Sequence, residues 1–166
     1  MEIRENTISI LVNNKPDVMA RIAGTFSGRG FNIETIAVNV TEDPQVSKII
    51  MTVWGNQDTI TKIEKQLNKM VDVLQVDDLT GKDAVRREMM LIRVEMPSGE
   101  GGRLMQTIDT CKGKVVSSEG NYWIIEVTGD RETIEKALAA LKPFGLDDLT
   151  RTGTVALARQ NDKVRR

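Results

Sequence analysis

The sequence contains no histidine and a single cysteine, Cys111, and these two scarcities exclude several kinds of chemistry. Histidine has the unperturbed pKa closest to neutrality and is the commonest protein metal ligand. Without it, Cys111 has no imidazole to deprotonate it, and a zinc site would need cysteines that the chain does not have. One cysteine also cannot form an internal disulfide, which favours a cytoplasmic location. We therefore expect neither a metal site nor catalysis by this chain alone.

Net charge and long apolar runs are also scarce. The 23 basic and 24 acidic residues give a net charge of −1, which argues against a protein that binds the phosphate backbone of nucleic acids. No apolar run approaches the length that spans a bilayer, and residues 1–5 lack the apolar core of a signal peptide. We expect no nucleic acid and no membrane among the partners.

Three short features give only weak evidence for RNA binding, phosphate binding or a reactive cysteine. The segment "GRGF" (28–31) resembles part of an RNA-recognition motif, but it lies at a predicted helix end, whereas that motif stacks bases on central strands. The glycine-rich "SGEGG" (98–102) lacks the Gly-Lys-Ser/Thr of a phosphate-binding loop and indicates a flexible connector. Cys111 is interpreted as a small apolar residue that closes a helix.

The apolar residues that are present, 40% of the chain, are arranged in a repeating order of strands and helices. In the first half, apolar periodicity predicts strand, helix, strand, strand, helix and strand. The strands cover 7–12, 32–40, 46–54 and 71–76, and the helices run from the "NNKPDV" segment to Gly28 and Gly30 and over 57–70. Val18, Ile22 and Phe26 place one apolar face on the first helix.

The second half repeats this scheme. Strands are predicted at 89–96, 114–118, 122–128 and 146–151, and helices at 103–111 and 131–141. "GNQDTITKIEKQL" (55–67) matches "GDRETIEKALAAL" (129–141) at several positions, and "DDLT" occurs at 77–80 and again at 147–150. Such recurrence at one point of both halves indicates two similar modules.

The order βαββαβ predicts the ferredoxin-like sandwich, with two helices on one face of an antiparallel sheet. The fold class is therefore α+β, with two consecutive modules. We expect domains at 1–80 and 89–158, a linker at 81–88 and a disordered tail at 159–166. The uncovered face of the first sheet is expected to meet another subunit.

The start of the first helix allows two interpretations. If Asn14 is the N-cap, Asp17 occupies the third helical position, as in a capping box, and Pro16 lies harmlessly in the first turn. Alternatively, the unpaired amides of the helix start bind the carboxylate of an amino acid. Asn14 and Asn32 would then hold the rest of the ligand, because this loop is expected beside the start of the second strand. The charge of Asp17 argues against the second interpretation.

Three longer segments carry a resemblance to a known family. They are "SILVNNKPDVMARIAGTFSGRGFNIETIAV" (9–38), "KQLNKMVDVLQV" (65–76) and "RTGTVALAR" (151–159). Together they resemble the regulatory (small) subunit of acetolactate synthase, also called acetohydroxyacid synthase, over nearly the whole chain. The resemblance implies that the first module is an ACT domain, which dimerises and binds an effector. It implies that the second module helps to engage the catalytic subunit.

The family resemblance also implies a function. Such a subunit is not an enzyme by itself; it activates the catalytic (large) subunit and confers feedback inhibition by valine in branched-chain amino-acid (valine, isoleucine, leucine) biosynthesis. The catalytic subunit would carry thiamine diphosphate, Mg²⁺ and FAD, with no cofactor in this chain. ACT domains of the family pair as homodimers with valine at the interface. Carried over to this sequence, the effector positions are Asn14, Asp17, Val18, Asn32 and Ile33.

One position departs from the family pattern. The family usually has glycine where this chain has Asp17, and a carboxylate there should crowd and repel the carboxylate of valine. Our hypothesis is that the chain activates its partner but senses valine weakly, or binds it in a shifted pose.

Two other functions use the same fold. A stand-alone ACT-type amino-acid sensor in transcriptional regulation would need a DNA-binding element, and the sequence shows neither a helix-turn-helix nor a basic stripe. A small enzyme on this sandwich would need a convergent group of titratable residues, which a chain without histidine does not suggest.

Overall fold

The structure is a computed structural model that describes residues 2–28, 31–96 and 98–159. The chain divides into two compact units. Unit 1 contains the described residues up to Val85 together with 154–159, and unit 2 contains the described residues of Arg86–Gly153. Across these described ranges, no helix has the length and apolar character needed to cross a membrane.

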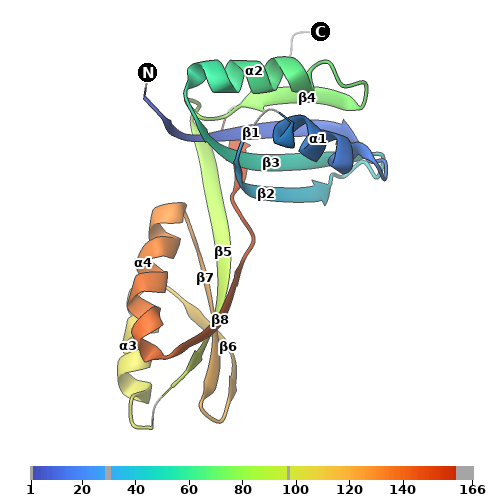
Figure 1. The fold of residues 1–166 in the computed structure, drawn as a ribbon. Coiled ribbons are helices and arrows are strands. Elements are labelled where there is room, and N and C mark those ends of the chain that lie inside the picture. The colour runs from blue at the N-terminus through green and yellow to red at the C-terminus, as the bar shows by residue number, and fades with distance from the viewer. Residues whose placement is uncertain (1, 29–30, 97, 160–166) are drawn as a thin grey trace. The chain divides into compact units, whose positions relative to one another are not determined.

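Unit 1 has the predicted βαββαβ order. Its elements are β1 (Arg4–Asn13), α1 (Val18–Ser27), β2 (Ile33–Val40), β3 (Val46–Gly55), α2 (Gln57–Leu67) and β4 (Val73–Asp78). The strands form one antiparallel sheet in the order β2-β3-β1-β4, and both helices lie on the same face of it (Figure 1). The prediction of a ferredoxin-like module is confirmed.

The core of unit 1 lies between this sheet and the helices. Alternate residues of β1 and β3 point to the helices because successive side chains of a strand point to opposite faces. The face of α1 predicted from Val18, Ile22 and Phe26 is buried against them. The fully buried strand residues of this core are Ile8, Ile10, Val12, Ile49, Met51 and Val53.

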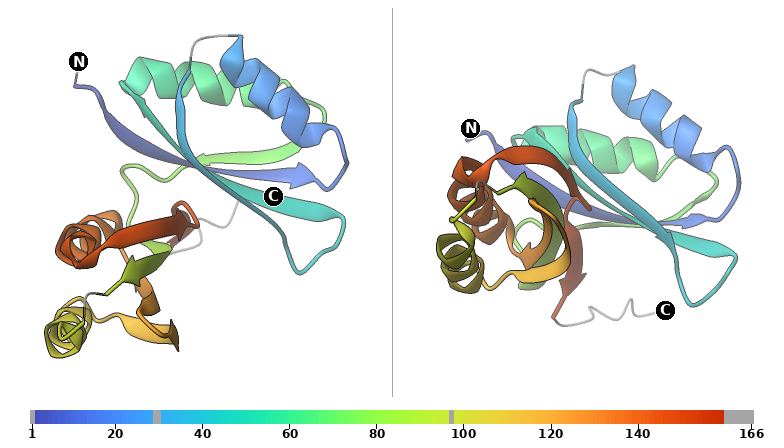
Figure 2. Two further views of the ribbon diagram at one scale, coloured as in Figure 1. Left: turned by 60° about the horizontal axis from the view of Figure 1, so that its bottom comes forward. Right: turned by 90° about the horizontal axis from the view of Figure 1, so that it is seen from below.

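Unit 2 repeats the architecture. Its elements are β5 (Ala84–Glu95, of which Ala84 and Val85 belong to unit 1), α3 (Gly101–Thr110), β6 (Lys114–Glu119), β7 (Tyr122–Gly129), α4 (Arg131–Leu141), a 3₁₀ turn (Lys142–Phe144) and β8 (Leu146–Arg151). The sheet order is β6-β7-β5-β8, and Figure 2 shows α3 and α4 together on one side of that sheet. The prediction of a second module is confirmed.

The helix starts of α2 and α4 are the same local structure. Asn56 accepts hydrogen bonds from the backbone N and the hydroxyl of Thr59, both at 3.0 Å. Asp130 accepts the corresponding bonds from Thr133 at 2.8 and 2.6 Å. A side-chain oxygen at the N-cap satisfies one of the free amides of the first turn. This part of the internal repeat therefore marks equivalent positions in the two units.

The "DDLT" repeat does not mark equivalent positions. In unit 1, the second aspartate, Asp78, lies opposite Ile8 at the end of β4. In unit 2, Asp148 lies opposite Arg93, in the first half of β8, directly beside a β-bulge. The pairing register, and not the letters alone, decides which residues correspond, because a shift along the ladder changes every cross-strand partner.

The predicted linker is in part a strand. β5 begins at Ala84, and the division between the two units falls after Val85. The charged segment 81–88 was expected to lack regular structure because it has no apolar periodicity. Backbone pairing rather than side-chain burial accounts for the strand, since β5 pairs with a short strand, β9 (Val155–Ala158).

The end of the predicted second domain also differs. Residues 154–159 belong to unit 1, where Ala156 packs with Ile50 and Leu79. Ile50 points to the sheet face opposite the helices, because its neighbours Ile49 and Met51 point into the helix-side core. The chain itself thus covers part of the face that we expected another subunit to cover.

Two predicted features fall partly outside the described residues. Of the predicted tail, Arg159 is described and its backbone N donates to the Asp83 carbonyl at 2.9 Å, while 160–166 lie outside the described residues. Gly28 ends α1 as its C-cap, as predicted, but Gly30 also lies outside them.

Candidate effector site

The loop between β1 and α1 is held by hydrogen bonds to two neighbouring segments. The backbone N of Asn14 donates to the Gln45 carbonyl at 2.8 Å, and its side-chain amide donates to the Pro44 carbonyl at 3.0 Å. Both acceptors lie in the turn that joins β2 to β3. Asn14 is exposed, so its side chain both anchors the loop and faces solvent.

Asp17, not Asn14, is the N-cap of α1, and the capping-box prediction is therefore wrong. The helix begins at Val18, and the Asp17 side chain makes no capping hydrogen bond. The backbone of Asp17 is close to helical, with φ −95° and ψ −6°, whereas a capping side chain normally goes with an extended backbone. Its carboxylate instead pairs with Arg21 Nε at 3.3 Å, one turn along the helix.

The position of the Asp17 carboxylate decides whether it competes with an anionic ligand for the amides at the start of α1. Because its carboxylate pairs with Arg21, it does not occupy the first-turn amides of α1. Those amides carry the positive end of the helix dipole and suit a carboxylate ligand. The charge of Asp17 still opposes an anion, but the Arg21 guanidinium beside it reduces the net effect.

The sequence reasoning missed the central residue of this region, Asp72. This residue is only 4% exposed and lies in the turn before β4. It accepts hydrogen bonds from Lys15 Nζ at 2.8 Å, from the Asn13 side-chain amide at 3.1 Å, and from Arg21. These donors, Lys15 first, hold the pKa of the Asp72 carboxyl well below its ordinary value. Asp72 thus ties together the loop, the first turns of α1 and the start of β4.

A signal for Asp72 was present in the sequence. It is a lone acid between Val71 and Val73, in a segment otherwise read as an apolar strand. A charged residue in such a place is buried only if it is paired. Its partners come from a segment more than fifty residues away, which no local pattern identifies.

The predicted site residues divide by exposure. Asn14, Asp17 and Asn32 are exposed, so their side chains are accessible to a ligand. The Val18 side chain is 1% exposed within the core, and Ile33 packs partly buried against the same core. For Val18, only the backbone at the helix start faces the candidate site.

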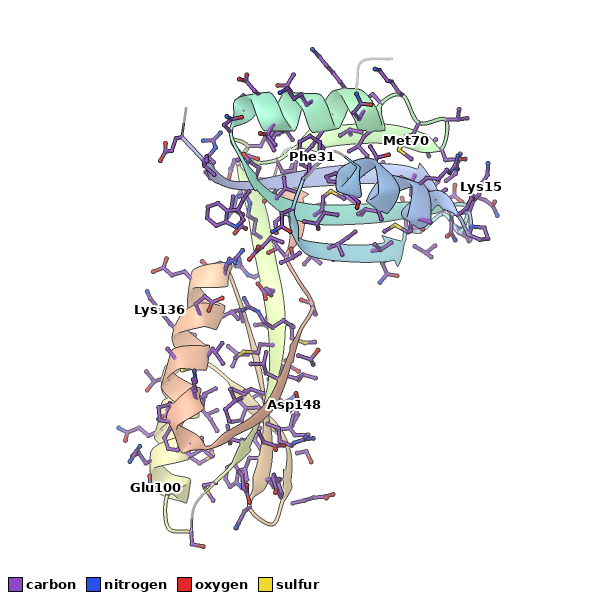
Figure 3. All side chains as sticks on the ribbon, in the orientation of Figure 1. Lys15, Phe31, Met70, Glu100, Lys136 and Asp148 are labelled. Carbon is purple, nitrogen blue, oxygen red and sulfur yellow. The ribbon has the colours of Figure 1, made fainter. Side chains whose placement is uncertain are left out.

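The structure does not bring the five residues together within one chain. Asn13, next to Asn14, lies opposite Val46 on β3, whereas Ile33, next to Asn32, lies opposite Val53. Seven strand residues at about 3.3 Å each separate the two ends by about 23 Å. Figure 3 shows Lys15 at one end of α1 and Phe31 beyond the other. Our expectation that this loop lies beside the start of β2 is therefore wrong, because α1 carries the chain back across the sheet.

The edge strand β2 presents apolar side chains to solvent. The sheet order places β2 at an edge, and Ile36, Val38 and Val40 are 39%, 43% and 48% exposed. They lie opposite Met51, Ile49 and Ser47, so they point to the same side of the sheet as the helices. An edge strand with exposed β-branched residues is a template for pairing with another strand.

The described residues give little support for metal binding or for catalysis by cysteine. Within the described ranges, no group of three or more His, Cys, Asp and Glu residues could hold a metal ion. Burial raises the pKa of the Cys111 thiol, which keeps it protonated and a poor nucleophile.

Comparison with known proteins gives the class of the protein module by module. The family model described as the AHAS small subunit-like ACT domain matches residues 8–75, so the first module is of the ACT type. The model described as the small subunit of acetolactate synthase matches residues 87–160. Two ferredoxin-like modules in tandem, the first an ACT domain, define a class of regulatory proteins.

Full-length relatives give the family. The chain is 37% identical over 159 residues to the probable acetolactate synthase small subunit of Archaeoglobus fulgidus, covering 96% of this chain and 99% of the relative. It is 37% identical to the acetolactate synthase small subunit of Aquifex aeolicus, covering 96% and 83%. The crystal structure of the small subunit from Thermotoga maritima matches with a TM-score of 0.88 and 37% identity, covering 95% and 99%. The chain belongs to the acetolactate synthase small subunit family, and it is a non-catalytic subunit of a synthase complex.

Proposed function

We propose that this chain activates the catalytic subunit of acetolactate synthase and makes it responsive to valine. The family membership supports the catalytic partner, and the ACT module supports an amino-acid effector. The cofactors thiamine diphosphate, Mg²⁺ and FAD are assigned to the catalytic subunit, and both subunits to the cytoplasm. Valine stabilises one arrangement of the subunits over another, and catalytic activity differs between them. Such coupling amounts to about 1–3 kcal/mol in typical allosteric proteins.

The effector site is completed by a second copy of the chain. The observation that carries this proposal is the placement of Asn14 and Asn32 at opposite ends of one module. A two-fold axis makes two β2 edges run antiparallel, which sets the start of one strand beside the end of the other. Val40 and Val12 both lie opposite Ser47, so the end of β2 adjoins the loop before α1. The Asn32 of one copy thereby meets the Asn14 loop of its partner.

Each group then has a defined role. The first-turn amides of α1 bind the carboxylate of valine, and Asn14 from one copy and Asn32 from the other hold its polar edge. The exposed residues of β2, Ile36, Val38 and Val40, become buried between the copies and contribute the apolar part of the interface. Asp17 weakens the site through repulsion of the carboxylate, moderated by Arg21.

Mixed dimers test this arrangement. Asn14→Ala and Asn32→Ala chains are co-expressed with two different tags, and the dimers carrying both tags are purified. One of the two sites in a mixed dimer combines both substitutions, and the other is intact. Calorimetric titration should find one valine per mixed dimer with wild-type affinity, while each homodimer binds at least tenfold more weakly.

The same experiment can contradict the proposal. If the residues acted within one chain, every site of the mixed dimer would carry one substitution, and affinity would not recover. If the wild-type chain formed no dimer, the site would lack its second half.

A further inference from the structure

The sheet face of unit 2 that points away from α3 and α4 is rich in carboxylates. Pairing register identifies its members, because residues opposite one another share a face. Leu91 lies opposite Glu126, Arg93 lies opposite Ile124 and Asp148, and Glu95 lies opposite Tyr122. Lys114 and Glu119 extend the face along β6. We call the acidic face the set Glu95, Glu119, Glu126, Asp147 and Asp148 together with the cations Arg93 and Lys114.

The charge of this face is not cancelled locally. Arg93 is held between Asp147 and Asp148; its Nε donates to Asp147, and its Nη2 lies 3.7 Å from the Asp148 carboxylate. The negative charge of Glu95 raises the pKa of the Tyr122 phenol beside it. Five carboxylates face two cations, in a chain whose net charge is only −1. Figure 3 shows Asp148 on the side of the sheet away from α3 and α4.

The acidic face is also hollowed. A pocket of about 460 Å³ is lined by Arg93, Glu119, Tyr122 and Asp147 among others, with Ile124 as an apolar part of its wall. A second hollow of about 170 Å³ adjoins Leu91, Ile124 and Leu149. An apolar floor within a charged rim is the composition of a protein-docking surface.

The negative charge of the acidic face limits which kind of partner can bind there. A second copy of the chain would place the same excess of carboxylates against itself, which is costly. Nucleic acid and small anions are repelled for the same reason. A protein surface carrying lysine or arginine around apolar side chains complements both the rim and the floor.

The matching face of unit 1 has a different character. There Ile50 packs with Leu79 and with Ala156 from the chain's own end, and Thr7 and Ser9 are buried. On the acidic face, by contrast, Glu119 and Asp148 are exposed. The two modules thus differ in whether the chain itself covers this sheet face.

We propose that the acidic face docks the catalytic subunit, through basic and apolar side chains of that subunit. This inference rests on the proposed function, which supplies the partner, and it adds the surface and the chemistry by which the partner is recognised. Charge complementarity of this kind acts mainly on the association rate and weakens as salt screens it.

The test reverses charge on the face. Wild type, the double variant Glu119→Lys with Asp148→Lys, and Asp109→Lys as a matched control are titrated against the catalytic subunit of the same organism. Asp109 is an exposed acid on α3, on the other side of the sheet, where a lysine near the helix end is tolerated. The double variant should bind at least tenfold more weakly and depend less on salt between about 50 and 500 mM, whereas Asp109→Lys should match wild type.

A second double variant, Glu119→Gln with Asp148→Asn, removes the two charges without changing side-chain size. It controls for the possibility that the lysine variant loses affinity because it misfolds. The amide oxygen that Asp148→Asn introduces can still accept the hydrogen bond that the Leu149 backbone N donates to the Asp148 carboxylate. This variant should lose severalfold in affinity with an unchanged melting temperature. If wild type activates the catalytic subunit and both double variants bind as tightly as wild type, the docking surface is wrong and the proposed function stands. If wild type fails to activate, the proposed function itself is wrong.

Discussion

The two modules differ at one structurally equivalent position near the start of the last strand. In unit 1 the backbone N of Asn13 donates to the carbonyl of Asp72 at 2.8 Å; in unit 2 the backbone N of Glu95 donates to the carbonyl of Gly145 at 2.7 Å. Both bonds join the end of the first strand of a module to the residue before its last strand. The same backbone connection therefore carries an aspartate in one module and a glycine in the other.

The difference shows how one fold supports the loop before its first helix with a buried charge in one module only. Asp72 reaches the loop before α1 and holds Lys15 and Arg21 there. Gly145 has a φ of +85°, and a Cβ on it would lie 2.6 Å from the Glu95 carbonyl oxygen. Unit 2 has no room for a side chain at this point. The loop proposed to bind the effector is thus supported by a buried charge in unit 1, and the corresponding point of unit 2 has no such charge.

The largest effect is expected for Gly145→Ala. The positive φ and the contact with a backbone oxygen should together cost about 3 kcal/mol of unfolding free energy in unit 2. Urea unfolding followed by tryptophan fluorescence, with Trp123 retained and Trp54 replaced by Phe, reports on this unit. Gly102→Ala in α3, where a Cβ would meet no atom within 4 Å, is the matched control. Equal stability of the two variants would show that glycine is not required at Gly145.

A second experiment removes the charge that distinguishes unit 1. Asp72→Asn keeps the size of the side chain but loses the pairing with Lys15 and Arg21, so the loop before α1 should become mobile. Valine affinity should fall about tenfold, because the loop loses the buried carboxylate that holds Lys15 and Arg21 in place. Calorimetric titration measures this effect, and Asp109→Asn, which alters an exposed acid in unit 2, should bind valine like wild type.

Acid unfolding gives a second readout of the same residue. The pKa of Asp72 is lower in the folded chain than in the unfolded chain, so the unfolded state takes up its proton first as the pH falls. The stabilisation from Asp72 is complete above the unfolded pKa and is lost below it, as the pH falls towards the folded pKa. Wild type should therefore lose more stability than Asp72→Asn when the pH falls below about 4. Parallel pH profiles of the two proteins would contradict a folded-state role for this carboxylate.

The smallest effect is expected for Asp17→Gly, which tests the role of Asp17 in valine binding. Replacement by glycine removes a charge near the ligand carboxylate while Arg21 stays paired with Asp72, so valine affinity should rise about threefold. Glycine is itself tolerated as an N-cap, so stability should change little. Calorimetry compares the two proteins directly, and equally tight binding by both would remove Asp17 from the account of valine sensing.

Much of the fold could be predicted from local patterns. The apolar faces of the helices, the alternation in the strands and the repeated helix starts at Asn56 and Asp130 all follow from interactions within a few residues. The "DDLT" repeat misled for the opposite reason: the register of β4 and β8 depends on strands far away in the sequence.

The candidate site was predictable only in part. Asn14 was predicted at the helix start and Asn32 at the start of the second strand, but their separation required the direction of α1 across the sheet. Asp72 was missed because its partners come from a distant loop.

Apolar periodicity was enough to predict the α+β fold class and its two βαββαβ modules, because it depends on neighbours along the chain, whereas the family was predicted from the resemblance of three longer segments. Which residues meet depends on the tertiary structure: Asp72 joins Lys15 and Arg21, residues 154–159 return to unit 1, and Asn14 and Asn32 lie at opposite ends of a module. The physical reason is that burial and ion pairing are set by which segments lie side by side, and local sequence carries no record of that.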